Sequence, residues 1–142
     1  MGRIIHFEIT AADVDRAAKF YTEAFGWEPR DSPFAGGYKV AATGPGAGVD
    51  GAIMTREYQS QATIAWLEVD DIDAAMDAVR RAGGRVAGER NTIPGQGHVV
   101  YVEDTEGNLL GLKQPLTPEP AGALGAVEPA RRRELSPGPA RP

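Results

Sequence analysis

An internal repeat in the sequence limits the fold more than any other feature. The segment Asp13-Val14-Asp15-Arg16-Ala17 recurs 58 residues later as Asp71-Ile72-Asp73-Ala74-Ala75. Upstream, His6-Phe7-Glu8-Ile9 resembles Trp66-Leu67-Glu68-Val69 at an offset of 60, which implies a difference of two residues in the connecting loop. Chance similarity between short segments is the alternative. A true repeat of this size indicates two copies of one structural unit that pack against each other.

Each copy has the pattern of a strand followed by a helix and three short strands. Apolar and polar residues alternate in residues 3–10, which is typical of a strand with one buried face. An aspartate N-cap and an apolar stripe then predict a helix, from Asp13 to Gly26 in the first copy and from Asp71 to Gly84 in the second. The remaining strands are expected near residues 27–31, 37–43, 50–56, 63–69, 85–91, 98–104 and 108–114.

This order predicts an α+β fold with the arrangement β-α-β-β-β present twice. The helix of each copy packs on the sheet face that carries the apolar residues. The opposite face of the first strand carries His6 and Glu8. Two sheets whose helix-free faces meet would enclose a cleft, so the polar residues on these faces are candidates for its chemistry.

The composition changes near residue 115. Seven of the eleven prolines lie between residues 115 and 142, where large apolar side chains are few. Such a segment buries too little apolar surface to offset the entropy of ordering it. We therefore expect a domain over residues 1–115, with modules at about 3–57 and 62–114, and a flexible tail rich in Pro, Ala and Gly over 116–142.

The composition also excludes several classes of function. Cysteine is absent, which removes disulfides, thiolate catalysis and thiolate metal sites. A net charge of −5 argues against nucleic-acid binding as the main activity. The chain contains neither a run of eighteen apolar residues nor an N-terminal signal-peptide pattern. We therefore expect a cytoplasmic protein whose partners include no nucleic acid and no membrane.

The repeated pattern resembles the vicinal-oxygen-chelate superfamily, which includes glyoxalase I, bleomycin-resistance proteins and extradiol dioxygenases. The resemblance rests on Ile5-His6-Phe7-Glu8-Ile9, on Phe25-Gly26-Trp27 at the end of the first helix, and on Glu103-Asp104-Thr105-Glu106-Gly107-Asn108 before the last strand. It covers about residues 3–115. It implies two βαβββ modules that form an open barrel-like cleft, and a homodimer.

Metal-dependent members of this superfamily hold a divalent cation with side chains from the first and last strands of each module, commonly His and Glu. Carried over to this sequence, these positions are His6, Ala52, Trp66 and Gly111, with the register of Ala52 open by one residue. One imidazole is too little, because protein sites generally supply about three or four ligands. We therefore predict no metal and no other cofactor; a divalent metal held by other ligands is the alternative.

The same positions suggest a cleft that holds an organic molecule. Ala52 and Gly111 remove bulk and charge, and Trp66 either stacks on a ligand or fills the former metal site as part of the core. His6 and Glu8 are the candidate catalytic residues, as a general base beside a carboxylate or as polar residues inherited from the fold. The candidate ligand-binding residues are Tyr38, Ala52, Met54, Trp66, Glu68, Tyr101 and Gly111.

Three classes of function fit these residues, and whether the protein is an enzyme stays open at this point. The leading hypothesis is a protein with a degenerate metal site that binds a small organic molecule and transfers a proton without a metal, as a lyase or isomerase does. The alternative is a non-catalytic protein that sequesters a compound, as bleomycin-resistance proteins do. The second alternative is a metal-dependent enzyme of the glyoxalase or dioxygenase type.

Overall fold

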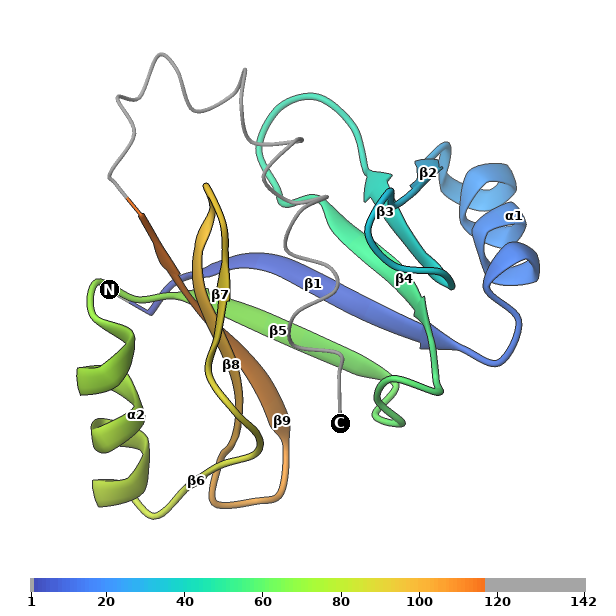
Figure 1. The fold of residues 1–142 in the computed structure, drawn as a ribbon. Coiled ribbons are helices and arrows are strands. Elements are labelled where there is room, and N and C mark those ends of the chain that lie inside the picture. Colours follow the sequence, from blue (N-terminus) through green and yellow to red (C-terminus); the bar gives the residue numbers. More distant parts are fainter. Residues whose placement is uncertain (1, 117–142) are drawn as a thin grey trace.

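In the part of the chain that the structure describes, two helices and nine strands follow one another in the order that the repeat predicts (Figure 1). The computed structural model describes residues 2–116, so the predicted tail lies outside the described residues apart from Leu116. The predicted strand at 85–91 is divided into two short strands, which both pair with the same neighbour. The elements are β1 (Ile4–Ala11), α1 (Val14–Phe25), β2 (Glu28–Asp31), β3 (Tyr38–Ala42), β4 (Gly51–Thr55), β5 (Thr63–Glu68), α2 (Ile72–Arg81), β6 (Arg85–Val86), β7 (Asn91–Ile93), β8 (Gly97–Glu103) and β9 (Leu109–Pro115).

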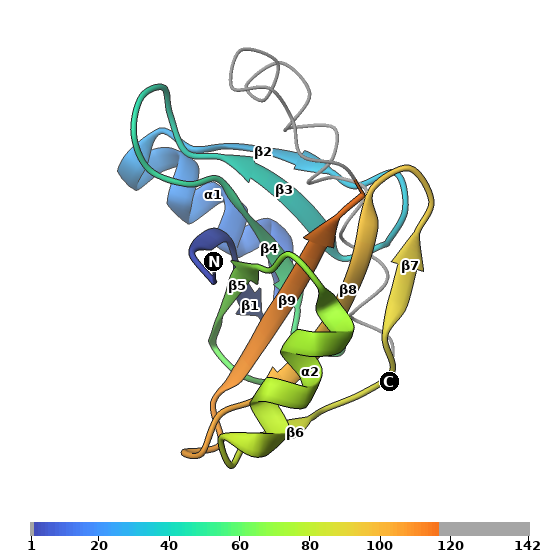
Figure 2. The ribbon, with the colours of Figure 1, turned by 90° about the vertical axis from the view of Figure 1, so that its left-hand side faces the viewer.

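The two modules join through their first strands, β1 and β5, which are antiparallel neighbours at the centre of one sheet. The strand order is β2-β3-β4-β1-β5-β9-β8-β6, and β7 also pairs with β8. In each module the last strand returns to lie parallel to the first, β4 beside β1 and β9 beside β5. The sheet is curled and unclosed, with α1 and α2 far apart at its two ends (Figures 1 and 2).

Both helices begin at the aspartates that the sequence predicts. Asp13 accepts a hydrogen bond from the backbone N–H of Arg16 at 2.9 Å, and Asp71 accepts one from Ala74 at 3.1 Å. Gly26 ends α1 with a φ of 76°, a left-handed conformation that favours glycine. Neither helix in the described part of the chain is long and apolar enough to cross a membrane.

The two faces of the sheet have separate cores. On the outer face, α1 packs against a cluster that includes Ile53, and α2 packs against a cluster that includes Val100. The inner face, which we call the concave face, has its own cluster of buried residues, among them Tyr38, Trp66 and Tyr101. His6 and Glu8 lie on the same face and are also buried, as the alternation of β1 predicts.

Replacing Asp71 with Ala should lower the free energy of unfolding by about 1 kcal/mol, because the N-terminus of α2 loses the acceptor of the Ala74 N–H. The control is D70A, which removes an exposed carboxylate one residue earlier. It should lower the free energy of unfolding by less than about 0.5 kcal/mol. Urea denaturation followed by circular dichroism measures both values. Equal losses in the two variants would contradict the capping role.

Candidate functional site

Strand pairing forms two rows of residues across the concave face, which together contain six of the nine predicted site residues. The first row runs through four strands and consists of His6, Trp66, Gly111 and Tyr101. The second row also runs through four strands and consists of Ile64, Glu8, Ala52 and Val40. The first row lies on β5, β9 and β8 of the second module and on β1 of the first module. The second row lies on β1, β4 and β3 of the first module and on β5 of the second module.

The internal repeat relates the two rows, so that Glu8 corresponds to Trp66 and His6 corresponds to Ile64. Glu8 and Trp66 each lie five residues before the N-cap of the following helix. The offset of 58 therefore applies to the strands as well as to the helices. This corrects the expected match of His6 with Trp66, which rested on the similar spacing of Glu8 and Glu68. The expected correspondence of Ala52 with Gly111 agrees with the pairing.

Glu8 is the centre of the hydrogen bonding on the concave face, with only 1% of its surface exposed. The hydroxyl of Tyr38 donates to Oε2 at 2.8 Å, and the hydroxyl of Tyr101 donates to Oε1 at 2.7 Å. The two tyrosines come from β3 and β8, one strand in each module. The carboxylate therefore connects the two halves of the sheet through neutral donors.

Burial raises the pKa of Glu8 above its ordinary value, because an ionised carboxylate loses its hydration in the core. The Trp66 indole N–H and the Tyr101 and Tyr38 hydroxyls lower this pKa but do not outweigh burial. The indole N–H lies near the carboxylate without forming a hydrogen bond of normal length and angle. Burial and then the charge of Glu8 raise the pKa of both tyrosines, so they stay protonated and act as donors.

His6 extends this network by one group. Its Nε2 lies 3.3 Å from the hydroxyl oxygen of Tyr38. Since Tyr38 donates its single proton to Glu8, its oxygen accepts from His6, and the contact requires a proton on Nε2. The structure thus links an imidazole to the buried carboxylate through one hydroxyl.

Trp66 fills the space beside Gly111. A Cβ atom added at Gly111 would lie only 2.1 Å from the indole Cδ2. Trp66 is 2% exposed, belongs to the concave-face core and packs its ring against Tyr101 with 5.2 Å between ring centroids. Of the two roles expected for Trp66, this packing favours the filling of the core.

The donors on the concave face do not fit a metal ion. Of the four positions carried over from the superfamily, only His6 offers a ligand atom, and Ile64, which replaces Trp66 in the corrected alignment, offers none. Glu8 is a second donor, but each of its oxygens already accepts a hydrogen bond. Within residues 2–116, no three His, Cys, Asp or Glu side chains gather closely enough to hold an ion. We therefore derive no step through a metal.

The other predicted residues divide between the concave face and its rim. Met54 is fully buried in the same core, opposite Tyr38. Glu68 is half-exposed at the end of β5, 3.9 Å from Arg3, and does not join the network around Glu8. Lys113 on β9 was not predicted from the sequence to lie in the site, yet it is only 5% exposed on the same face. The alternation along β9 could have found it, because Lys113 is two residues from Gly111.

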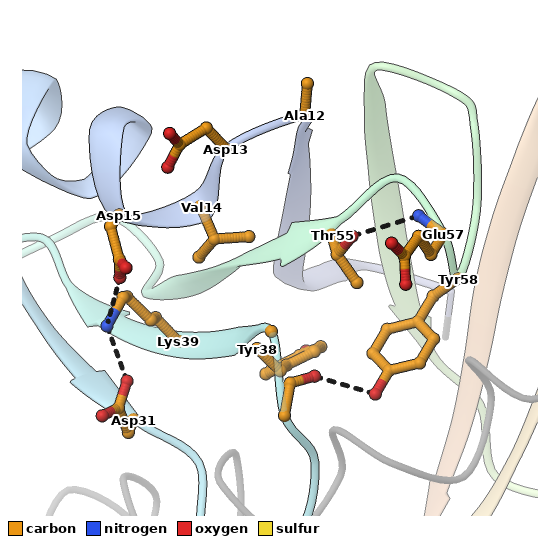
Figure 3. A pocket seen from close by; sticks show the side chains of 12 residues that line it. Ala12, Asp13, Val14, Asp15, Asp31, Tyr38, Lys39, Thr55, Glu57 and Tyr58 are labelled. Atoms are coloured by element: carbon orange, nitrogen blue, oxygen red, sulfur yellow. Dashed lines mark hydrogen bonds and ion pairs between the residues drawn. The ribbon is translucent and has the colours of Figure 1, made fainter.

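A separate pocket of about 490 Å³ lies between the start of α1 and the strands β3 and β4 (Figure 3). Carboxylates dominate its polar lining, and the ammonium group of Lys39 lies 2.6 Å from Asp31 and 3.3 Å from Asp15. Tyr38 is the single predicted site residue in this lining. Tyr38 is also the residue that this lining shares with the network around Glu8.

Comparison with known proteins gives consistent matches. The model of the Glyoxalase/Bleomycin resistance protein/Dioxygenase superfamily matches residues 3–112. A probable lactoylglutathione lyase of Vibrio parahaemolyticus is 32% identical over 128 residues, covering 80% of this chain and 91% of that protein. A glyoxylase-like domain-containing protein of Didymella fabae is 32% identical over 114 residues, 75% of this chain and 89% of that protein. The crystal structure of methylmalonyl-CoA epimerase from Mycobacterium tuberculosis has a similar fold, with a TM-score of 0.59 and 21% identity over 82% of this chain and 89% of that one.

The substitution G111A should destabilise the protein by about 1–3 kcal/mol, because the added methyl group collides with a ring that the core holds in place. G88A is the matched control, since a Cβ at Gly88 meets no atom within 4 Å. Chemical denaturation of both variants measures the difference. A stable G111A protein with an unchanged Trp66 environment in near-ultraviolet circular dichroism would contradict the packing.

The variant E8Q should become more stable than the wild type as the pH rises. The folded protein holds a proton on Glu8 more strongly than the unfolded chain, so this contribution is complete below the ordinary pKa of 4.5 and is lost as the pH rises through the raised value. Each unit of the upward shift is worth about 1.4 kcal/mol. Denaturation over a pH series measures the advantage of E8Q, with E89Q at an exposed loop position as the control. An advantage that is independent of pH would count against a raised pKa.

Proposed function

The chain belongs to the Glyoxalase/Bleomycin resistance protein/Dioxygenase superfamily, and we propose that it transfers a proton on a small carbonyl compound without a metal ion. In this proposal the substrate binds on the concave face, and Glu8 is the base. A carboxylate can remove a proton from carbon only where a neighbouring group acidifies the C–H bond, and a carbonyl group does so. This requirement sets the substrate class.

The observation that carries the proposal is the environment of Glu8. Its carboxylate is buried, its hydrogen-bond donors are two neutral hydroxyls, and no ion pair joins it to a basic side chain in the described part of the chain. A base of raised pKa holds a proton more strongly than an exposed carboxylate, which favours its removal from carbon.

The proton transfer can be written as a balanced step. The proton leaves carbon for one oxygen of Glu8, and the electron pair of the C–H bond moves to the carbonyl oxygen to form an enolate. The tyrosine that donated to the newly protonated oxygen is then free to donate to the enolate oxygen. Return of the proton to the same carbon completes an epimerisation or an exchange, and return to the neighbouring atom completes an isomerisation.

The names of the related proteins support this class of reaction. The relatives include a probable lactoylglutathione lyase, and the structural neighbours include methylmalonyl-CoA epimerase. An epimerase inverts a stereocentre, for which removal and return of a proton is a direct route. These names support the type of chemistry and assign no substrate to this chain.

Non-catalytic binding is the second candidate, and the burial of Glu8 favours it. Both carboxylate oxygens are satisfied within the protein, so the network around Glu8 could serve only to order the core. In that case a ligand would bind with no turnover, and Glu8 would contribute to stability alone. A homodimer and a cytoplasmic location stay predictions of the sequence.

The wild-type protein should accelerate the exchange of the methyl protons of pyruvate or of methyl pyruvate with heavy water, which proton magnetic resonance measures directly. The variant E8Q should lose at least about a hundredfold of this acceleration, because an amide cannot take the proton. The rate in the wild type should rise with pH, with a midpoint above 4.5. E89Q is the control and should keep the full rate. Exchange that is unaffected in E8Q would refute the role of Glu8, and binding without exchange would support the second candidate.

A further inference from the structure

The pocket beside the start of α1 is a cavity that the proposed proton transfer does not use (Figure 3). Its volume of about 490 Å³ is typical of sites that hold a ligand. The ring of Tyr58, whose hydroxyl donates to the carbonyl oxygen of Gly36 at 2.8 Å, forms one wall. The cavity is therefore large enough to receive a small molecule or several side chains.

The charge of this pocket is negative. Its lining contains four carboxylates and one ammonium group, which belong to Asp13, Asp15, Asp31, Glu57 and Lys39. The ammonium group of Lys39 is shared between Asp15 and Asp31, at 3.3 and 2.6 Å. Asp13 lies 3.9 Å from Arg16, and Glu57 forms no ion pair with a residue that the structure describes. The pocket therefore attracts a cation.

The spacing of the carboxylates favours an extended cation over a metal ion. No three His, Cys, Asp or Glu side chains of residues 2–116 gather closely enough to hold an ion. Several arginine side chains can each meet one carboxylate, because a guanidinium group is planar and has five N–H donors. Guanidinium groups also stack on aromatic rings such as that of Tyr58. Arginine therefore matches both the charge and the aromatic wall of the pocket.

The sequence itself contains a group of such cations. Arg131, Arg132 and Arg133 form the single run of three basic residues in the sequence. Residues 2–116, by contrast, contain eleven basic and seventeen acidic side chains. The arginine run lies outside the described residues, and the proposed proton transfer gives it no role. Its charge is complementary to that of the pocket.

The arginine run is long enough a chain away to reach the pocket of its own domain. Strand β9 runs parallel to β5 and antiparallel to β1 and β4, so Leu116 leaves the sheet at the end opposite to Thr55, which lines the pocket. The eight residues of β1 and the three strand spacings from β9 to β4 give a separation of about 30 Å. The 15 residues from Leu116 to Arg131 span up to about 50 Å when extended.

We infer that this pocket is the docking site of residues 131–133 of the same chain. The guanidinium groups pair with the carboxylates that Lys39 does not satisfy, and one of them stacks on Tyr58. Tyr38 also lines the pocket and donates to Glu8, so the docked segment lies beside a residue of that network. The docking does not depend on proton transfer by Glu8.

A spin label close to the arginine run tests the docking in the full-length chain. The sequence has no cysteine, so S136C supplies one thiol for a nitroxide, three residues after Arg133. The nitroxide should broaden the amide signals of residues around the pocket, such as Gly37, Thr55 and Tyr58, in two-dimensional magnetic resonance spectra. Pocket signals that stay sharp would overturn the inference.

Charge variants of the labelled chain show whether the arginines and the pocket carboxylates are responsible. Replacing all three arginines with Gln should abolish the broadening at the pocket. E57Q should lower it about two- to fivefold, because it removes one exposed ion pair. E89Q, at an exposed loop position outside the pocket, is the matched control and should leave it unchanged. Broadening that survives the arginine replacement would contradict the docking, and this variant leaves the described domain untouched.

Two further measurements distinguish the other possible occupants. When spin-labelled chains without isotope are mixed with isotope-labelled chains without a nitroxide, docking within one chain predicts no broadening. Broadening of the pocket signals in this mixture would assign the segment to a second copy and overturn the inference. Agmatine, a free guanidinium compound, should compete with the segment and reduce the broadening in the labelled chain. Agmatine binding together with broadening that the arginine replacement does not change would assign the pocket to a small molecule instead.

Discussion

The two hydrogen bonds that hold the Glu8 carboxylate link the two modules across the concave face, in addition to the backbone pairing of β1 with β5. Tyr38 and Tyr101 come from different modules, so the carboxylate fixes the distance between β3 and β8 across the curled sheet. Neutral hydroxyls stabilise the ion without the full compensation that a cation would give. For this reason burial dominates, and the pKa of Glu8 is raised. Burial of this network in the core thus raises the pKa of the group that we propose as the base.

The repeat explains why the concave face is asymmetric. At corresponding positions, one module has the carboxylate of Glu8 and the other has the indole of Trp66. The residues that pair with them also differ in size. Ala52 pairs with Glu8, whereas Gly111 pairs with Trp66 and has no side chain in the space that the indole ring occupies. Together, these exchanges leave two donors, His6 and Glu8, where a metal ion needs three or more. The chemistry proposed for this face therefore uses a proton.

The sequence predicted the elements well because local patterns determine them. The aspartate caps, the glycine after α1 and the alternation in β1 act over a few residues, and each appears where expected. The inward position of His6 and Glu8 follows from the same alternation. The register between distant strands is different, because pairing between β1 and β5 depends on the packing of the whole sheet. Short-range similarity therefore matched Glu8 with Glu68, whereas the structure matches it with Trp66. No local pattern shows that the hydroxyls of Tyr38 and Tyr101 converge on Glu8.

The titration of Glu8 in the folded protein tests the central claim most directly. The chemical shift of its carboxyl carbon, assigned by comparison with E8Q, can be followed by magnetic resonance across the pH range in which the protein stays folded. The account predicts a midpoint clearly above the ordinary value of 4.5, and a titration that moves closer to 4.5 when the core is opened by denaturant. A midpoint at or below 4.5 in the native protein would show that the carboxylate is hydrated or paired with a cation, and would contradict the account.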